Sequence, residues 1–370
     1  MLAVSDRARL LFVLSLVYSI TFTIGSCSGD TITLWNLETV EKDVASFNFD
    51  GVLFQDGTSL DWSMIKSGTL SSRDQTTFDS YLKNVGQLLY RIRIRLQSKD
   101  YKGAGENAEA IYKHYRTRNS KMAYLVCQAI MWARLADGHR AAAVDPYLRC
   151  YAILKSSPGL EKSLPGDRRL KYDAKSGVCD ELQPIWFDKV AVEKAMPAVT
   201  ATIRELNSPP PAARIYFASM AMTTGKSSFA SSILAGLNST DGSLGELVMI
   251  LKSQNEVENG TGSVTVKALL EQSESLSESN RPLAYYWCGI HQAKTDLDGG
   301  LLLLLRVPAL YGERHPDLAA AAISAALKLV TSADQNQRAS VLRRELLESF
   351  PDTFHAKNLL RDINVATDDN

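Results

Sequence analysis

The chain contains 370 residues, 45% of them hydrophobic, with 41 basic and 41 acidic side chains. This composition is typical of a globular protein with a sizeable core, and it excludes a disordered, collagen-like or polytopic membrane protein. Because the net charge is zero, the chain lacks the positive charge that drives non-specific binding to nucleic acid, and we expect no nucleic-acid partner.

Residues 1–26 have the pattern of a signal peptide. Two arginines precede an apolar stretch over residues 10–24, and two small residues follow it. The fifteen residues of this stretch are interrupted by two serines and two threonines, and they are too short to span a hydrocarbon layer about 30 Å thick with ease. We therefore predict export with cleavage, and an uncleaved signal anchor is the alternative.

The junction Ile24-Gly25-Ser26-Cys27 resembles the bacterial lipobox, in which an aliphatic residue and two small residues precede a cysteine. This resemblance implies cleavage before Cys27 and a lipid on its thiol, which would anchor the protein to a membrane. Ordinary signal-peptidase cleavage nearby is the alternative, and the sequence leaves both routes open. By either route we expect the mature protein in the periplasm or elsewhere in the cell envelope.

Residues 27–68 are expected to form a small β module. Short runs rich in β-branched and aromatic residues alternate with Asp50-Gly51 and Asp56-Gly57, which are typical hairpin turns. We expect three or four strands in a meander or an SH3-like barrel that leans on the segment after it. Its aromatic residues are predicted to be core, and a ligand-facing patch is the alternative. They are Trp35, Phe47, Phe49, Phe54 and Trp62.

A linker from Ser67 to Thr77 precedes a change to a 3.6-residue period, which continues to about Val365. The period predicts helices near 76–98, 102–117, 120–136, 139–155, 187–206, 211–223, 226–237, 243–256, 262–276, 281–296, 299–310, 316–332, 335–349 and 354–365. Helices joined by short turns indicate a mainly α protein, and we expect an α-solenoid of helical hairpins.

Two interruptions of this pattern suggest domain boundaries. Residues 156–186 form a long irregular segment, and the sequence NSPPP at 207–211 is a stiff boundary. The predicted parts are an N-terminal helical array over 69–155, an irregular connection with a linking helix over 156–210, a C-terminal array over 211–366 and a tail over 367–370. The charged residues Arg168, Arg169 and Lys171 of the connection are expected to be solvated, with an anionic lipid or glycan as the alternative partner.

Several hairpins resemble the tetratricopeptide repeat, which has about 34 residues and small residues where its two helices cross. Pro351 follows Ala339 by twelve residues, the spacing between the small residue of the second helix and the closing proline of such a repeat. Gly289 stands at a crossing position. Tyr101 and Ala104 stand at the turn aromatic and the small position of an earlier repeat.

The resemblance is good over 280–366, fair over 76–155 and poor over 187–275. The whole plan looks like uncharacterised bacterial envelope proteins. It is also similar to repeat-containing lipoproteins that help to assemble the outer membrane or coordinate division. Such families bind partners in grooves and carry no catalytic residues. The resemblance therefore implies a non-enzymatic scaffold or adaptor for an envelope protein or peptide segment, and no site residue carries over.

The sequence shows no catalytic, metal or cofactor motif. Residues 224–227 end like a phosphate-binding loop, but Met220 stands where that loop requires a glycine. The five histidines are scattered, and no cysteine or carboxylate cluster has metal-ligand spacing. We therefore expect no enzyme, no cofactor and no metal.

The residues that bind a partner are left unknown. Five aromatic residues on predicted first helices are candidates for a groove surface, although such residues more often form repeat core. They are Tyr124, Trp132, Tyr285, Tyr286 and Trp287. The second hypothesis is a cell-wall or carbohydrate-binding protein, with an unrecognised hydrolytic activity left open. It requires Trp35 and Trp62 to be exposed for stacking on sugars.

Five cysteines are too few for a disulfide-rich scaffold. Cys127, Cys150 and Cys288 lie in apolar helical patterns, where a buried free thiol behaves as a small hydrophobic group. We predict free thiols at these positions. A disulfide between Cys150 and Cys179, closing the irregular connection, is the alternative.

Overall fold

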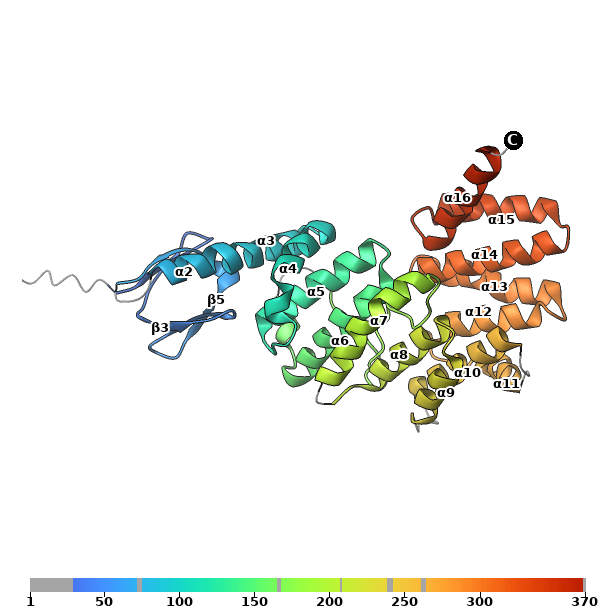
Figure 1. The fold of residues 1–370 in the computed structure, drawn as a ribbon, viewed down its shortest axis with the longest axis horizontal. Coiled ribbons are helices and arrows are strands. Elements are labelled where there is room, and N and C mark those ends of the chain that lie inside the picture. Colours follow the sequence, from blue (N-terminus) through green and yellow to red (C-terminus); the bar gives the residue numbers. More distant parts are fainter. Residues whose placement is uncertain are drawn as a thin grey trace, which may run out of the picture. The chain divides into compact units, whose positions relative to one another are not determined.

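The computed structural model describes residues 29–71, 75–164, 168–206, 208–237, 242–260 and 264–368. The predicted signal peptide and Cys27 lie outside these residues. The chain divides into two compact units, Met1–Tyr90 and Arg91–Asn370. The protein is mainly helical, and its first unit contains a small antiparallel β module (Figure 1). Among the described helices, none combines the length and apolarity needed to cross a bilayer.

The β module consists of two three-stranded antiparallel sheets, with strand orders β2-β1-β6 and β3-β4-β5. The strands are β1 (Thr31–Leu34), β2 (Thr39–Glu41), β3 (Val44–Phe47), β4 (Gly51–Phe54), β5 (Ser59–Asp61) and β6 (Ile65–Thr69). The second sheet is a meander, since its strands pair in chain order. The first sheet pairs β1 with β6, where Thr31 lies opposite Thr69. The module has six described strands where three or four were expected, because β2 and β3 fall in one sequence run and β5 and the start of β6 in another.

The core of the first unit combines strand and helix residues. Along β4, Val52 and Phe54 are buried and Leu53 is exposed, which is the alternation of a half-buried strand. The strands are followed by α2 (Gln75–Tyr81), the π-helical turn η2 (Leu82–Gly86) and α3 (Gln87–Gln97). Phe78 of α2 and Trp62 are fully buried, with ring centroids 5.3 Å apart. The module therefore leans on the helix after it, as expected, and the compact unit continues past residue 68.

The second unit is helical, and consecutive helices pack side by side in neighbouring pairs (Figure 1). The helices are α4 (Tyr101–Tyr115), α5 (Lys121–Ala136), α6 (Arg140–Ser156), α7 (Lys189–Glu205), α8 (Pro211–Thr223), α9 (Ser227–Ala235), α10 (Gly242–Asn259), α11 (Val264–Gln272), α12 (Arg281–Gln292), α13 (Leu297–Tyr311), α14 (Pro316–Ser332), α15 (Asn336–Ser349) and α16 (Phe354–Asp368). Each range predicted after residue 100 overlaps one of these helices, with ends that differ by a few residues.

Small residues let paired helices approach closely. A methyl group at Gly289 of α12 would lie 2.8 Å from Leu304 Cγ and 3.0 Å from the carbonyl oxygen of Gly300, both on α13. This confirms the crossing position predicted at Gly289. In α4 the predicted small residue Ala104 is fully buried, and the neighbouring Gly105 makes the close approach to α5.

The irregular segment between α6 and α7 is largely buried over residues 168–188. The hydroxyl of Tyr147 on α6 donates to the carbonyl oxygen of Gly177. The N–H of Cys179 donates to the hydroxyl oxygen of Tyr216 on α8, at 2.9 Å. A covered loop needs partners for its backbone polar groups, and these tyrosines supply them.

The same segment also contacts helices far along the chain. The Phe187 ring lies 6.1 Å from that of Tyr286 on α12 and 4.7 Å from that of His355 on α16. Asp180 pairs with Arg314, which follows α13, at 3.0 Å. Residues 168–188 therefore connect helices from both predicted arrays, and the two arrays belong to one compact unit.

His315 precedes α14 beside these contacts, and its side chain gives the second unit a predicted sensitivity to acid. Burial, together with the nearby positive charges of Arg314 and Arg140, lowers its pKa to about 4. An unfolded imidazole titrates near pH 6.5, so the unfolded chain binds a proton first as the pH falls. The stabilising effect of neutral His315 is therefore complete above about pH 6.5 and is lost as the pH falls toward 4.

We expect the variant His315→Asn to lose less unfolding free energy than the wild type between pH 6.5 and 4, by on the order of 2 kcal/mol. Urea unfolding at several pH values in this range measures the difference. Parallel pH profiles for the two proteins would contradict the prediction.

Candidate functional site

The aromatic residues that the sequence offered as groove candidates belong to the core. Tyr124, Trp132, Tyr285, Tyr286 and Trp287 are all buried, with at most 8% of each residue exposed. The guanidinium of Arg168 lies 3.8 Å from the ring centroid of Trp132, a cation–π arrangement. Arg168 was expected to be solvated, but the connection folds back over α5 and brings it onto this ring.

The aromatic residues of the β module are also mostly internal. Trp62 is fully buried, and its indole N–H donates to the carbonyl oxygen of Asn48 at 2.5 Å. Trp35 is half-buried and stacks on Tyr90, with centroids 3.9 Å apart. Trp62 is therefore not available to stack on a sugar, although the carbohydrate hypothesis requires it to be exposed.

The cysteines of the described residues are buried free thiols, which confirms the prediction for Cys127, Cys150 and Cys288. Cys150 and Cys179 are separate thiols, so the alternative disulfide is absent here. Burial raises the pKa of Cys288 to about 12 and that of Cys150 well above its usual value. These groups stay protonated at neutral pH, which makes them poor nucleophiles.

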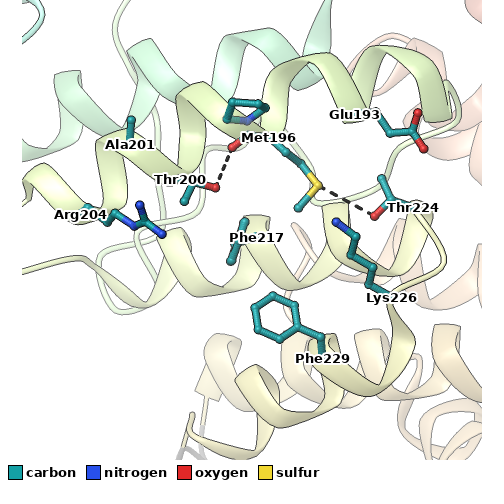
Figure 2. A pocket seen from close by; sticks show the side chains of 10 residues that line it. Glu193, Met196, Thr200, Ala201, Arg204, Phe217, Thr224, Lys226 and Phe229 are labelled. Carbon is teal, nitrogen blue, oxygen red and sulfur yellow. Dashed lines mark hydrogen bonds between the residues drawn. The ribbon is translucent and has the colours of Figure 1, made fainter.

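An open apolar trough lies between α7, α8 and α9, with a volume of about 640 Å³ (Figure 2). Phe217 of α8 forms its floor, and Phe229 of α9 stands at one side. The two rings meet edge to face with centroids 5.8 Å apart. Phe229 is 49% exposed, which is unusual for so large an apolar side chain.

One face of α7 forms the other side of the trough. The lining residues recur at the three- and four-residue steps that place side chains on one helix face. They are Glu193, Met196, Pro197, Thr200, Ala201 and Arg204. Val190, 58% exposed, extends this face by one turn. The opposite face of α7, which includes Val192 and Val199, is buried in the unit.

The polar groups inside the trough bond to one another. The hydroxyl of Thr200 donates to the carbonyl oxygen of Met196 at 2.8 Å, and that of Thr224 to the Met196 sulfur at 3.9 Å (Figure 2). Their donors are therefore in use, and the surface between them is apolar.

The charges at the rim are unevenly matched. Glu193 pairs with Lys189 at 3.9 Å. The exposed side chains of Arg204 and Lys226 make no hydrogen bond or ion pair with any residue that the structure describes. Figure 2 shows these two cations at opposite ends of the trough. The trough thus has an apolar surface around Phe217 and a cation, Arg204 or Lys226, at each end.

A second apolar groove, of about 540 Å³, lies between α13, α14 and α15. Leu302 and Val341 are 60% and 52% exposed in it. Leu302 belongs to a run of five leucines, 301–305, and the turn of the helix points its side chain outward. At its edge, Asp298 pairs with Arg338 at 2.8 Å, so the charges of this groove already neutralise each other.

A basic cavity of about 650 Å³ lies where α4, α6 and α7 end, lined by Arg116, Arg118, Arg149, Lys155 and the carboxylate of Glu205. The ends of these helices present carbonyl oxygens, which attract positive charge. Arg149 donates to the carbonyl oxygen of Arg116, and Arg118 to that of His114 at 2.9 Å. Arg149 and Arg118 therefore serve to satisfy the carbonyl groups at these helix ends.

Comparison with family models, curated proteins and solved structures finds no match for this chain. The likeness to tetratricopeptide repeats therefore rests on the residues alone. Within the described residues, no group of three or more His, Cys, Asp or Glu side chains has the arrangement to hold a metal ion. The α7–α9 trough is the candidate site that the sequence analysis missed, because its lining comes from three helices that meet only in the folded chain.

Proposed function

We propose that the protein is a non-enzymatic adaptor of the bacterial cell envelope, in which an α-solenoid of tetratricopeptide-like hairpins holds a segment of a partner protein. The signal-peptide pattern supports the location, and the sequence around Cys27 supports a lipid anchor. The observation that carries the proposal is the α7–α9 trough, an exposed apolar surface with two cations that no described residue neutralises. Apolar hollows with a few polar or charged groups at the rim are common binding sites.

The proposal places the binding surface at the trough and not at the groove aromatics. Trp132 and Tyr124 are buried, and residues 168–188 pack across the helices that carry several of these aromatic side chains. A partner at that face would have to displace a segment whose backbone is bonded to Tyr147 and Tyr216. The trough needs no such rearrangement.

In-cell photo-crosslinking tests the proposal. A photoreactive residue replaces Ala201, a small residue in the trough, and in a matched control it replaces Lys113, which is exposed on α4. We expect one envelope protein to be crosslinked from position 201 and not from position 113. Mass spectrometry identifies this protein and shows whether Cys27 carries a lipid.

Two results would contradict the adaptor proposal. One is the absence of a protein adduct specific to position 201. The other is co-purification of wall polymer alone, which would favour the carbohydrate-binding hypothesis.

A further inference from the structure

The length of the trough suits a helix. Along α7, the lining from Glu193 to Arg204 covers eleven residue rises, which is about 16 Å. α8 packs against α7 on one side and α9 on the other, so its Phe217 lies at the bottom of a channel between two helices. Such a channel accepts the ridge of side chains along another helix.

The hydrogen bonding of the trough excludes an extended peptide as a well-matched occupant. All three elements around it are helices, whose backbone groups bond within each helix and offer no strand edge. The hydroxyls of Thr200 and Thr224 are already bonded to Met196. An occupant must therefore satisfy its own backbone groups, which a helix does.

The rim charges define the ends of the occupant. Arg204 and Lys226 stand at opposite ends of the trough, and no described residue pairs with either. Glu193 is shared with Lys189. The α13–α15 groove lacks this feature, because Asp298 and Arg338 neutralise each other there. Charge complementarity therefore favours an acidic occupant for the trough and not for the α13–α15 groove.

We propose that the trough binds an amphipathic α-helix of a partner protein, about twelve residues long, with an apolar face and an acidic side chain near each end. This inference rests on the proposed adaptor function and specifies the chemistry of the partner segment. The apolar face contacts Phe217 and Phe229. The acidic ends meet Arg204 and Lys226.

A displayed peptide library provides the test. The peptides are sixteen residues long, with leucine and alanine fixed along one helix face and the residues at both ends randomised. They are selected against the full chain. We expect Asp and Glu to be enriched at both ends. Enrichment of basic residues, no enrichment at the ends, or no binders at all would overturn the proposal.

Charge reversal then distinguishes the charged contacts at the rim from non-specific hydrophobic binding of the peptide. In the double variant Arg204→Glu and Lys226→Glu, a selected peptide should bind about tenfold more weakly, which corresponds to about 1.4 kcal/mol. A peptide with lysines in place of its acidic ends should regain binding to this variant and bind the wild type poorly. The rescue shows that the variant is folded. Equal binding of either peptide to both proteins would overturn the inference.

The outcomes also distinguish this inference from the adaptor proposal. If position 201 crosslinks to a basic or non-helical segment in cells, the inference fails and the adaptor function stands. If the library yields acidic helices but no protein is crosslinked in cells, the adaptor function fails, and with it the role of the trough in holding a partner.

Discussion

Replacing Arg149 with methionine is expected to destabilise the second unit by about 3–5 kcal/mol, because it breaks a buried ion pair and leaves a carboxylate behind. The Arg149 side chain is 6% exposed and pairs with Asp145 at 3.2 Å and with Glu205 at 2.7 Å. It also donates to Thr202 at 2.7 Å, so one side chain joins α6 to α7. In the variant, Asp145 stays buried and keeps only the hydroxyl donors of Tyr112 and Thr202.

Urea unfolding of the variant measures the effect, and Arg116→Met is the matched control. Arg116 is 36% exposed and has one ion pair, to Glu205 at 3.5 Å, so its removal should cost less than about 1 kcal/mol. Adding Asp145→Asn to Arg149→Met should restore part of the loss, since it removes the uncompensated charge. Equal losses for Arg149→Met and Arg116→Met would show that the network does not stabilise the unit.

Replacing Trp62 with alanine is expected to cost the first unit about 3–5 kcal/mol, the usual effect of emptying a large core position. Trp62 is fully buried, stacks on Tyr81 with centroids 5.9 Å apart and lies 5.3 Å from the ring of Phe78. The truncation leaves a cavity between the sheets and α2. It also leaves the carbonyl oxygen of Asn48 without its indole donor.

Hydrogen exchange read by mass spectrometry localises this loss. Peptides from residues 31–69 should exchange much faster in Trp62→Ala, while peptides from α5 keep their protection. The control is Leu53→Ala, on the exposed side of β4, where the change should stay within about 0.5 kcal/mol. Unchanged exchange over 31–69 would mean that Trp62 is not a core residue of the module.

The helices could be predicted because each shows a hydrophobic period within its own residues. The 3.6-residue period of α12 to α15 and the small residue Gly289 identified the paired helices and one of their crossings. Strand pairing was harder to predict. β1 and β6 are separated by thirty residues and pair through backbone groups, which leave no trace in the side-chain pattern.

The candidate site could not be predicted from the sequence, because its residues come together only through packing. Phe229 and Ala201 lie in predicted helices, and Lys226 drew attention only as part of an incomplete phosphate-loop sequence. The trough face of α7 mixes proline, threonine and alanine with two charges, so its composition signals neither core nor binding surface. Only the packing of α7 and α9 on α8 brings these residues to one surface.

Local sequence pattern predicted the helical class of the chain, the β character of residues 31–69 and the burial of Cys127, Cys150 and Cys288, because these follow from periodicity and polarity over neighbouring residues. It did not predict that residues 168–188 lie against Trp132 and Tyr286, or that the open surface lies at the α7–α9 trough. The reason is that exposure depends on which elements pack against a face, and these contacts join residues too far apart in the chain for local pattern to record.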